Sequence, residues 1–105
     1  MTEEKRASER VPVNLPTCWH GATGTYEGRV EDLSVTGCFV NTKGPVDEGE
    51  IVSLLIQLPS GRWLPTRGKV AFYQQLTGFS ISFSILDDKE RETLNELVAQ
   101  QSPKA

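Results

Sequence analysis

Several stretches of this chain alternate apolar and polar residues with a period of two. The clearest example is residues 79–83, where Phe79, Ile81 and Phe83 alternate with serines. This period places every second side chain on one face of a β-strand, so each run predicts a strand with one buried face. The predicted strands cover residues 11–19, 25–33, 38–40, 51–58, 63–73 and 79–83.

Turn residues separate the predicted strands. Each of the segments 21–24, 42–45 and 59–61 contains glycine or proline. These two residue types interrupt regular structure. Pro65 and Gly68 fall inside the fifth predicted strand, which favours an edge position or a bend there.

The periodicity changes near the end of the sequence. Asp87 and Glu90 have the spacing of a helix capping box, and Leu94, Leu97 and Val98 then share one helical face. We expect that face to cover an opening of the sheet. The acidic residues expected in solvent are Asp88, Glu92 and Glu96.

Six strands followed by one helix predict a small β-barrel or sandwich. The 105 residues suit one domain, and the net charge of −3 argues against a nucleic-acid polymer as partner. No apolar run approaches the ~18 residues of a membrane span, and none follows the charged start as in a secretory signal. We therefore expect a cytoplasmic protein without membrane insertion, in which Cys18 and Cys38 are free thiols.

Two arginines precede the first predicted strand, in the segment Arg6-Ala7-Ser8-Glu9-Arg10. A guanidinium binds phosphate through two parallel hydrogen bonds, pairs with guanine O6 and N7, and stacks on π faces. Alternatively, Arg6 and Arg10 belong to a solvated tail of mixed charge.

A second polar segment, Asp32-Leu33-Ser34-Val35-Thr36-Gly37, follows the second predicted strand. The Asp32 carboxylate can accept hydrogen bonds from guanine N1–H and N2–H₂, and the Ser34 hydroxyl can reach a phosphate oxygen or orient the arginines. Gly37 permits a positive φ or close approach of a ligand. An ordinary turn would use the same residue types, because Asp and Ser bond nearby backbone amides.

Taken together, the two segments resemble the PilZ domain family, whose members bind cyclic di-GMP through RxxxR and [D/N]xSxxG motifs. The resemblance implies a six-stranded antiparallel β-barrel with a C-terminal α-helix, and Gly78 to Phe83 resembles the last strand of the family. It also implies that Arg6 and Arg10 hold guanine edges and phosphates, facing a wall formed by Asp32, Ser34 and Gly37.

The resemblance implies a mobile N-terminal arm over residues 1–10, a barrel and helix over 11–100, and a frayed tail over 101–105. The implied function is a non-enzymatic cyclic di-GMP receptor, in which the ordered arm signals to an effector protein. The alternative within the family is an adaptor that binds a protein without nucleotide.

Other side chains have less defined roles. Lys5 either adds a phosphate contact or is solvated. For Trp63, Phe72 and Tyr73 we expect packing in the barrel, with stacking on a guanine as the alternative. Arg67 and Lys69 should face the same side of their strand, where they either extend a positive surface or are ordinary exposed charges.

Metal and catalytic sites have little support. Cys18 and His20 form a C-x-H pair, but zinc normally takes four ligands, and Cys38 and Asp32 complete the set poorly. His20 is the sole histidine, and no nucleophile–base arrangement is supported. We therefore expect no metal, no cofactor and no enzymatic activity.

Overall fold

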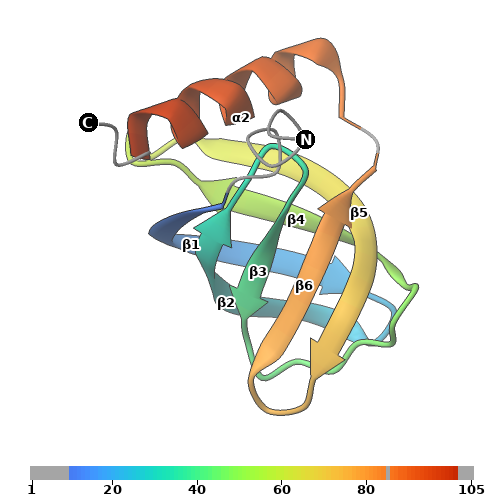
Figure 1. The fold of residues 1–105 in the computed structure, drawn as a ribbon. Helices are drawn as coiled ribbons and strands as arrows, with labels where there is room; N and C mark the ends of the chain where they lie inside the picture. Colours follow the sequence, from blue (N-terminus) through green and yellow to red (C-terminus); the bar gives the residue numbers. More distant parts are fainter. Residues whose placement is uncertain (1–9, 85, 102–105) are drawn as a thin grey trace, which may run out of the picture.

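The structure is a computed structural model that describes residues 10–84 and 86–101. Six antiparallel strands form a closed barrel in the order β1-β2-β3-β6-β5-β4, and one helix follows them (Figure 1). The elements are β1 Val11–Gly21, β2 Gly24–Leu33, β3 Gly37–Asn41, β4 Ile51–Gln57, β5 Trp63–Gln74, β6 Gly78–Phe83 and α2 Asp88–Gln101. The predicted antiparallel barrel with a C-terminal helix is confirmed.

The helix covers one end of the barrel. β1 pairs with β2 along its length but with β4 only between Thr17 and His20, so the two strands diverge at the start of β1. α2 contacts β1 and β5 and lies across this end in Figure 1. Leu94 and Leu97 are buried in the core, as their helical spacing predicted.

The start of the helix has the predicted capping box. The Glu90 amide donates to Asp87 Oδ1 at 2.8 Å, and the Asp87 amide donates to Glu90 Oε1 at 3.1 Å. These bonds satisfy backbone donors that the first helical turn leaves without partners. Within the described residues, no helix combines the length and apolar character needed to span a bilayer.

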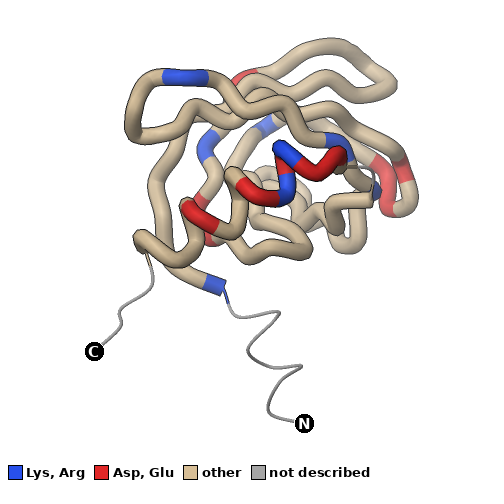
Figure 2. The backbone as a smooth tube through the Cα atoms, turned by 90° about the horizontal axis from the view of Figure 1, so that it is seen from above, with Lys and Arg blue, Asp and Glu red and all other residues tan. Residues whose placement is uncertain are grey.

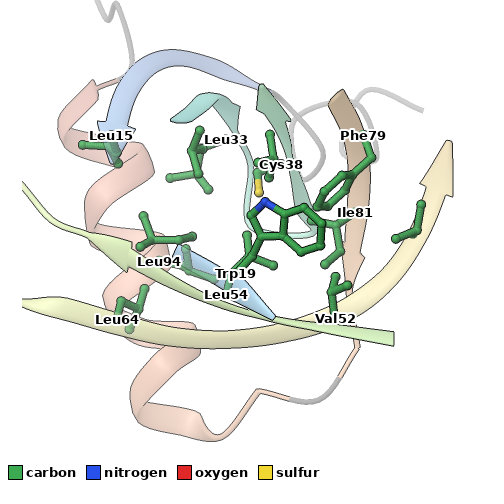
Figure 3. Close-up of a cluster of buried hydrophobic side chains, with 14 of the residues drawn as sticks. Leu15, Trp19, Leu33, Cys38, Val52, Leu54, Leu64, Phe79, Ile81 and Leu94 are labelled. Atoms are coloured by element: carbon green, nitrogen blue, oxygen red, sulfur yellow. The ribbon is translucent and has the colours of Figure 1, made fainter. Parts of the chain in front are cut away.

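Trp19 lies at the centre of the core. Its ring packs edge-on against Phe79, with centroids 5.0 Å apart, and tilted against Tyr26 at 4.8 Å. The indole Nε1–H donates to Thr42 Oγ1 at 3.0 Å, so the polar end of this buried ring is satisfied. Figure 3 shows the indole between Leu94 on one side and Phe79 with Ile81 on the other.

The suggested edge position of the fifth strand is wrong. β5 pairs with β4 on one side and β6 on the other, because the barrel closes. The alternative, a bend, agrees with the strong curvature of β5 in Figure 1. Gly68 is needed there for a different reason, since a Cβ at this position would overlap the carbonyl oxygen of Ser82 on β6.

Candidate ligand-binding site

A bulge near the end of β2 turns Asp32 outward. Val30 and Leu33 are both fully buried, although residues three apart on a regular strand face opposite sides. The β2–β3 register shifts between Val30 and Asp32, which allows both apolar residues to face the core. Glu31 and Asp32 are consequently both on the outer surface. Bulges often redirect a side chain in this way.

Arg10 reaches Asp32 from the start of β1. The pairing of Val11 with Leu33 brings the residue before β1 next to the end of β2. Arg10 Nη1 lies 2.7 Å from Asp32 Oδ1, with the two side chains 43% and 39% exposed. At this exposure an ion pair contributes about 0–1 kcal/mol. A ligand can therefore exchange partners with either group at little cost.

Ser34 shapes the bend that follows Asp32. Its side chain is buried, and its Oγ accepts hydrogen bonds from the amides of Thr36 and Gly37, each at 3.1 Å. The Ser34 amide donates to the Gly37 carbonyl at 2.8 Å, which closes the bend. The bend is also attached to the end of β6, because the Phe83 amide donates to the Thr36 carbonyl at 2.8 Å. In this structure the Ser34 hydroxyl positions the backbone and does not face solvent.

Gly37 is required by a close approach between strands. Gly37 is absent from the described glycines with positive φ, so of the two alternatives given for it the left-handed conformation does not apply. A Cβ at Gly37 would overlap the carbonyl oxygen of Ile81 on β6 and lie 3.2 Å from the Ile81 carbonyl carbon. Because these are backbone atoms of a paired strand, they cannot move aside easily.

The structure thus joins four of the five predicted site residues at one corner of the barrel. Arg10 and Asp32 present a hydrogen-bond donor and an acceptor side by side, while Ser34 and Gly37 fix the bend behind them. Guanine carries acceptors at O6 and N7 and donors at N1 and N2, so this pair complements its edge. Arg6 and Lys5 lie outside the described residues.

Phe39 is a neighbour that the sequence analysis did not single out. It lies opposite Asp32 on β3, followed by Ser80 on β6 and Phe72 on β5. Phe72 is 53% exposed, on the outer end of this row. The signal in the sequence was its place between Cys38 and Val40, which both face the core and so put Phe39 on the outer face of β3.

The expectation that the β5 aromatics pack inside the barrel is wrong for two of the three. Trp63 and Phe72 are 46% and 53% exposed, and Tyr73 is partly buried against the core. Arg67 and Lys69 both face outward on β5, as their spacing predicted. Trp63 is on the part of β5 that pairs with β4, away from Asp32.

The two cysteines are free and occupy opposite sides of the barrel wall. Cys38 is buried beside Leu33, and burial, together with the nearby Asp32 carboxylate, strongly raises the pKa of its thiol. Cys18 and His20 face outward on β1, where His20 Nδ1 lies 3.0 Å from Thr25 Oγ1. Among the residues described, no three potential metal ligands come together.

Basic and acidic residues are mixed along the part of the chain that the structure describes. Figure 2 shows basic and acidic positions interspersed along the chain, including along the helix. A hollow of about 490 Å³ lies near Cys18, Leu55 and Arg67, and none of the motif residues that the structure describes lines it. A ligand at Arg10 and Asp32 would therefore have to be held by local contacts on an open surface.

The model of the PilZ domain matches residues 4–100. The chain belongs to the PilZ domain family. No curated protein sequence matches it.

Solved structures support the same fold. The chain is similar to the PilZ domain of CeSA from a cellulose-synthesizing bacterium, with 24% identity and a TM-score of 0.72, over 89% of this PilZ chain and 97% of that one. The PilZ domain of YcgR from Escherichia coli, solved with c-di-GMP, gives 14% identity and a TM-score of 0.74 over 92% and 91%. The Bacillus subtilis motility inhibitor MotI/DgrA gives 19% and 0.75 over 96% of this chain but 53% of its own.

Proposed function

We propose that this PilZ protein is a non-enzymatic receptor for cyclic di-GMP. The observation that carries the proposal is the exposed pair of Arg10 and Asp32, one residue from each motif, joined at 2.7 Å. Family membership supports it, as does the similar fold of the YcgR domain that was solved with c-di-GMP.

The arginines and the carboxylate have complementary roles in this proposal. Asp32 accepts from guanine N1–H and N2–H₂, and Arg10 donates to guanine O6 and N7 or to a phosphate. Arg6, at the other end of the RxxxR motif, takes a second guanine or phosphate. Ligand binding then draws residues 6–9 onto the barrel beside Arg10, and the new surface is presented to an effector protein.

Isothermal titration tests the ligand. We expect saturable heat with cyclic di-GMP, and at least about tenfold weaker binding for Arg10→Ala and for Asp32→Ala. Arg62→Ala is the matched control, because it removes an exposed arginine from the turn before β5, and neither β4 nor β5 neighbours β2. Cyclic di-AMP is the control ligand, since it keeps the phosphates and lacks the guanine edges. Absence of heat, or unchanged affinity of Arg10→Ala, would refute the receptor.

Trypsin cleavage tests the arm separately. Lys5, Arg6 and Arg10 are cleavage sites, and saturating cyclic di-GMP should slow cutting there relative to sites on the barrel. Equal cutting with and without ligand would contradict the closing of the arm, while the proposal of a cyclic di-GMP receptor would stand. A protein partner bound equally well with and without nucleotide would instead favour the adaptor alternative.

A further inference from the structure

An uncharged row of side chains begins beside Asp32 and crosses β3, β6 and β5, which are neighbours in the barrel (Figure 1). Strand pairing places Asp32 opposite Phe39, Phe39 opposite Ser80, and Ser80 opposite Phe72. Phe39 and Ser80 each lie between two buried residues of their strands, so both face outward, as Phe72 does. We call Phe39, Ser80 and Phe72 the phenylalanine row.

The two aromatic side chains of this row are outside the core. Phe79 is fully buried and Phe83 packs against the core, whereas Phe39 is partly exposed and Phe72 is 53% exposed. A single exposed apolar residue is ordinary on a protein surface. Two exposed rings in one row that ends at a candidate ligand group indicate a surface for an apolar or aromatic part of a ligand.

Ser80 separates the two rings of the row. Phe39 and Phe72 are on strands two apart in the sheet, so their backbones are about 10 Å apart. Among the described residues, the aromatic pairs in contact are Trp19 with Tyr26 and Trp19 with Phe79. The rings of Phe39 and Phe72 therefore do not stack on each other, and the short Ser80 side chain between them cannot cover either one.

Charged side chains stand only at the border of the phenylalanine row. By strand pairing and hydrogen bonding, the bordering charges in the described chain are Arg10, Arg29, Glu31, Asp32, Glu48 and Lys69. Three of them are basic and three are acidic, so the border as a whole does not favour an anion. A ring that stacks on a nucleobase needs no charge, because every base has a π face. The row therefore suits a base better than a phosphate.

We propose that a guanine of the bound nucleotide stacks on Phe39. This inference rests on the proposed function, because the ligand is cyclic di-GMP. Asp32 and Phe39 are opposite residues on paired strands, with Cα atoms about 5 Å apart. A guanine whose N1–H and N2–H₂ reach the Asp32 carboxylate extends from β2 across β3. Its face then covers the Phe39 ring, and its far edge lies over Ser80. Phe39 thus fixes the plane of the base, while Arg10 and Asp32 bind its edge.

Titration calorimetry compares Phe39→Leu with Trp63→Leu. Leucine keeps an apolar side chain but removes the ring, so Phe39→Leu should bind cyclic di-GMP at least about fivefold more weakly than the wild type. Trp63→Leu is the matched control, because it removes a 46% exposed ring from the part of β5 that pairs with β4. It should leave the affinity unchanged. Phe39→Tyr retains the ring and should bind like the wild type. Equal affinities of Phe39→Leu and Phe39→Tyr would contradict stacking.

A bulkier side chain at Ser80 tests where the base lies. Ser80→Leu places an isobutyl group beside the Phe39 ring, under the far edge of the guanine, and should weaken binding at least about tenfold. Ser53→Leu is the matched control, because it makes the same change at an exposed position of β4, which neighbours neither β2 nor β3. Circular dichroism verifies that both variants are folded. A Ser80→Leu protein that binds normally would place the base elsewhere.

Fluorescence separates direct stacking from an indirect effect on the fold. Phe39→Trp puts an indole at the proposed contact, and saturating cyclic di-GMP should quench its emission. The wild-type protein, which contains Trp19 and Trp63, is the reference and should show little quenching, because Trp19 is buried and Trp63 is away from Asp32. A Phe39→Trp protein that binds the nucleotide but is quenched no more than the wild type would overturn the stacking.

The outcomes distinguish this inference from the proposed function. A wild-type protein that binds no cyclic di-GMP overturns both the receptor and the stacking on Phe39. A wild-type protein that binds, while Phe39→Leu retains the full affinity, leaves the receptor standing and refutes the role of Phe39 alone.

Discussion

Arg10 and Asp32 are 22 residues apart in the sequence, yet Arg10 Nη1 lies 2.7 Å from Asp32 Oδ1 on the surface of the barrel. The contact depends on the pairing of β1 with β2 and on the bulge that turns Asp32 outward. Because both groups are partly solvated, the pair holds a hydrogen-bond donor and an acceptor in place while both remain accessible from solvent.

Asp32→Asn should separate binding from stability. We expect at least about tenfold weaker cyclic di-GMP binding, because the neutral amide accepts the guanine donors less well. The free energy of unfolding should change by less than about 1 kcal/mol, since the ion pair is exposed. Titration calorimetry and urea denaturation measure the two quantities. Glu96→Gln, at an exposed acid on α2, serves as the control and should change neither.

Ser34→Ala should destabilise the protein by about 1–3 kcal/mol. The substitution leaves the amides of Thr36 and Gly37 without the Ser34 Oγ acceptor at a buried position. Urea denaturation measures the loss. Ser82→Ala removes an exposed hydroxyl opposite Gly37 on β6 and should cost far less. Equal effects of the two substitutions would mean that the Ser34 bonds do not hold the bend.

Gly37→Ala should be more damaging than Ser34→Ala. The new methyl group would overlap backbone atoms of Ile81, which forces β3 and β6 apart. We expect a loss of about 3 kcal/mol, or failure to fold. Gly61→Ala is the control, because Gly61 has a φ of +98° but no atom within 4 Å of the place that the alanine methyl group would take. Its cost is therefore conformational, about 1–2 kcal/mol. Thermal unfolding of both variants tests this order.

Cys38 should make the stability of the protein depend on alkaline pH. Burial raises the pKa of the Cys38 thiol well above its ordinary value of 9.0, so the folded protein retains a proton that the unfolded chain releases. The contribution of Cys38 to the free energy of unfolding is therefore complete below pH 9.0. Above that pH it declines by up to about 1.4 kcal/mol per pH unit.

The measurement is the difference between wild type and Cys38→Ala in urea denaturation from neutral to alkaline pH. The difference isolates Cys38 from lysines and tyrosines that titrate in the same range. Parallel curves for the two proteins would contradict the prediction. Thiol labelling provides a second check: Cys18 should react in the native protein, and Cys38 only after unfolding.

The sequence predicted those parts of the fold in which residue types recur at the regular spacing of a strand or a helix. The alternation of Phe79, Ile81 and Phe83 and the spacing of Asp87 with Glu90 indicated β6 and the start of α2. β5 was harder, because its inward positions include Thr66 and Gly68, so apolar residues do not mark its buried face. A register shift between Val70 and Phe72 then accompanies the outward position of Phe72.

The candidate site was predicted by residue type and not by geometry. The motifs identified Arg10, Asp32, Ser34 and Gly37, but nothing in their spacing showed that Ser34 is buried or that Gly37 faces Ile81. Those properties depend on how β3 lies against β6, which is a contact between segments far apart in the chain. A local sequence pattern contains no information on how closely β3 approaches β6.

The hydrogen bond from the Phe83 amide to the Thr36 carbonyl links the bend after Asp32 to β6, the last strand of the barrel. β6 is also the strand from which the chain continues into α2. If cyclic di-GMP binds as proposed and shifts the bend, we expect the shift to be passed to β6 and so to the start of α2. We expect amide resonances at the helix cap to move during a titration with cyclic di-GMP, which would make α2 a remote reporter of occupancy.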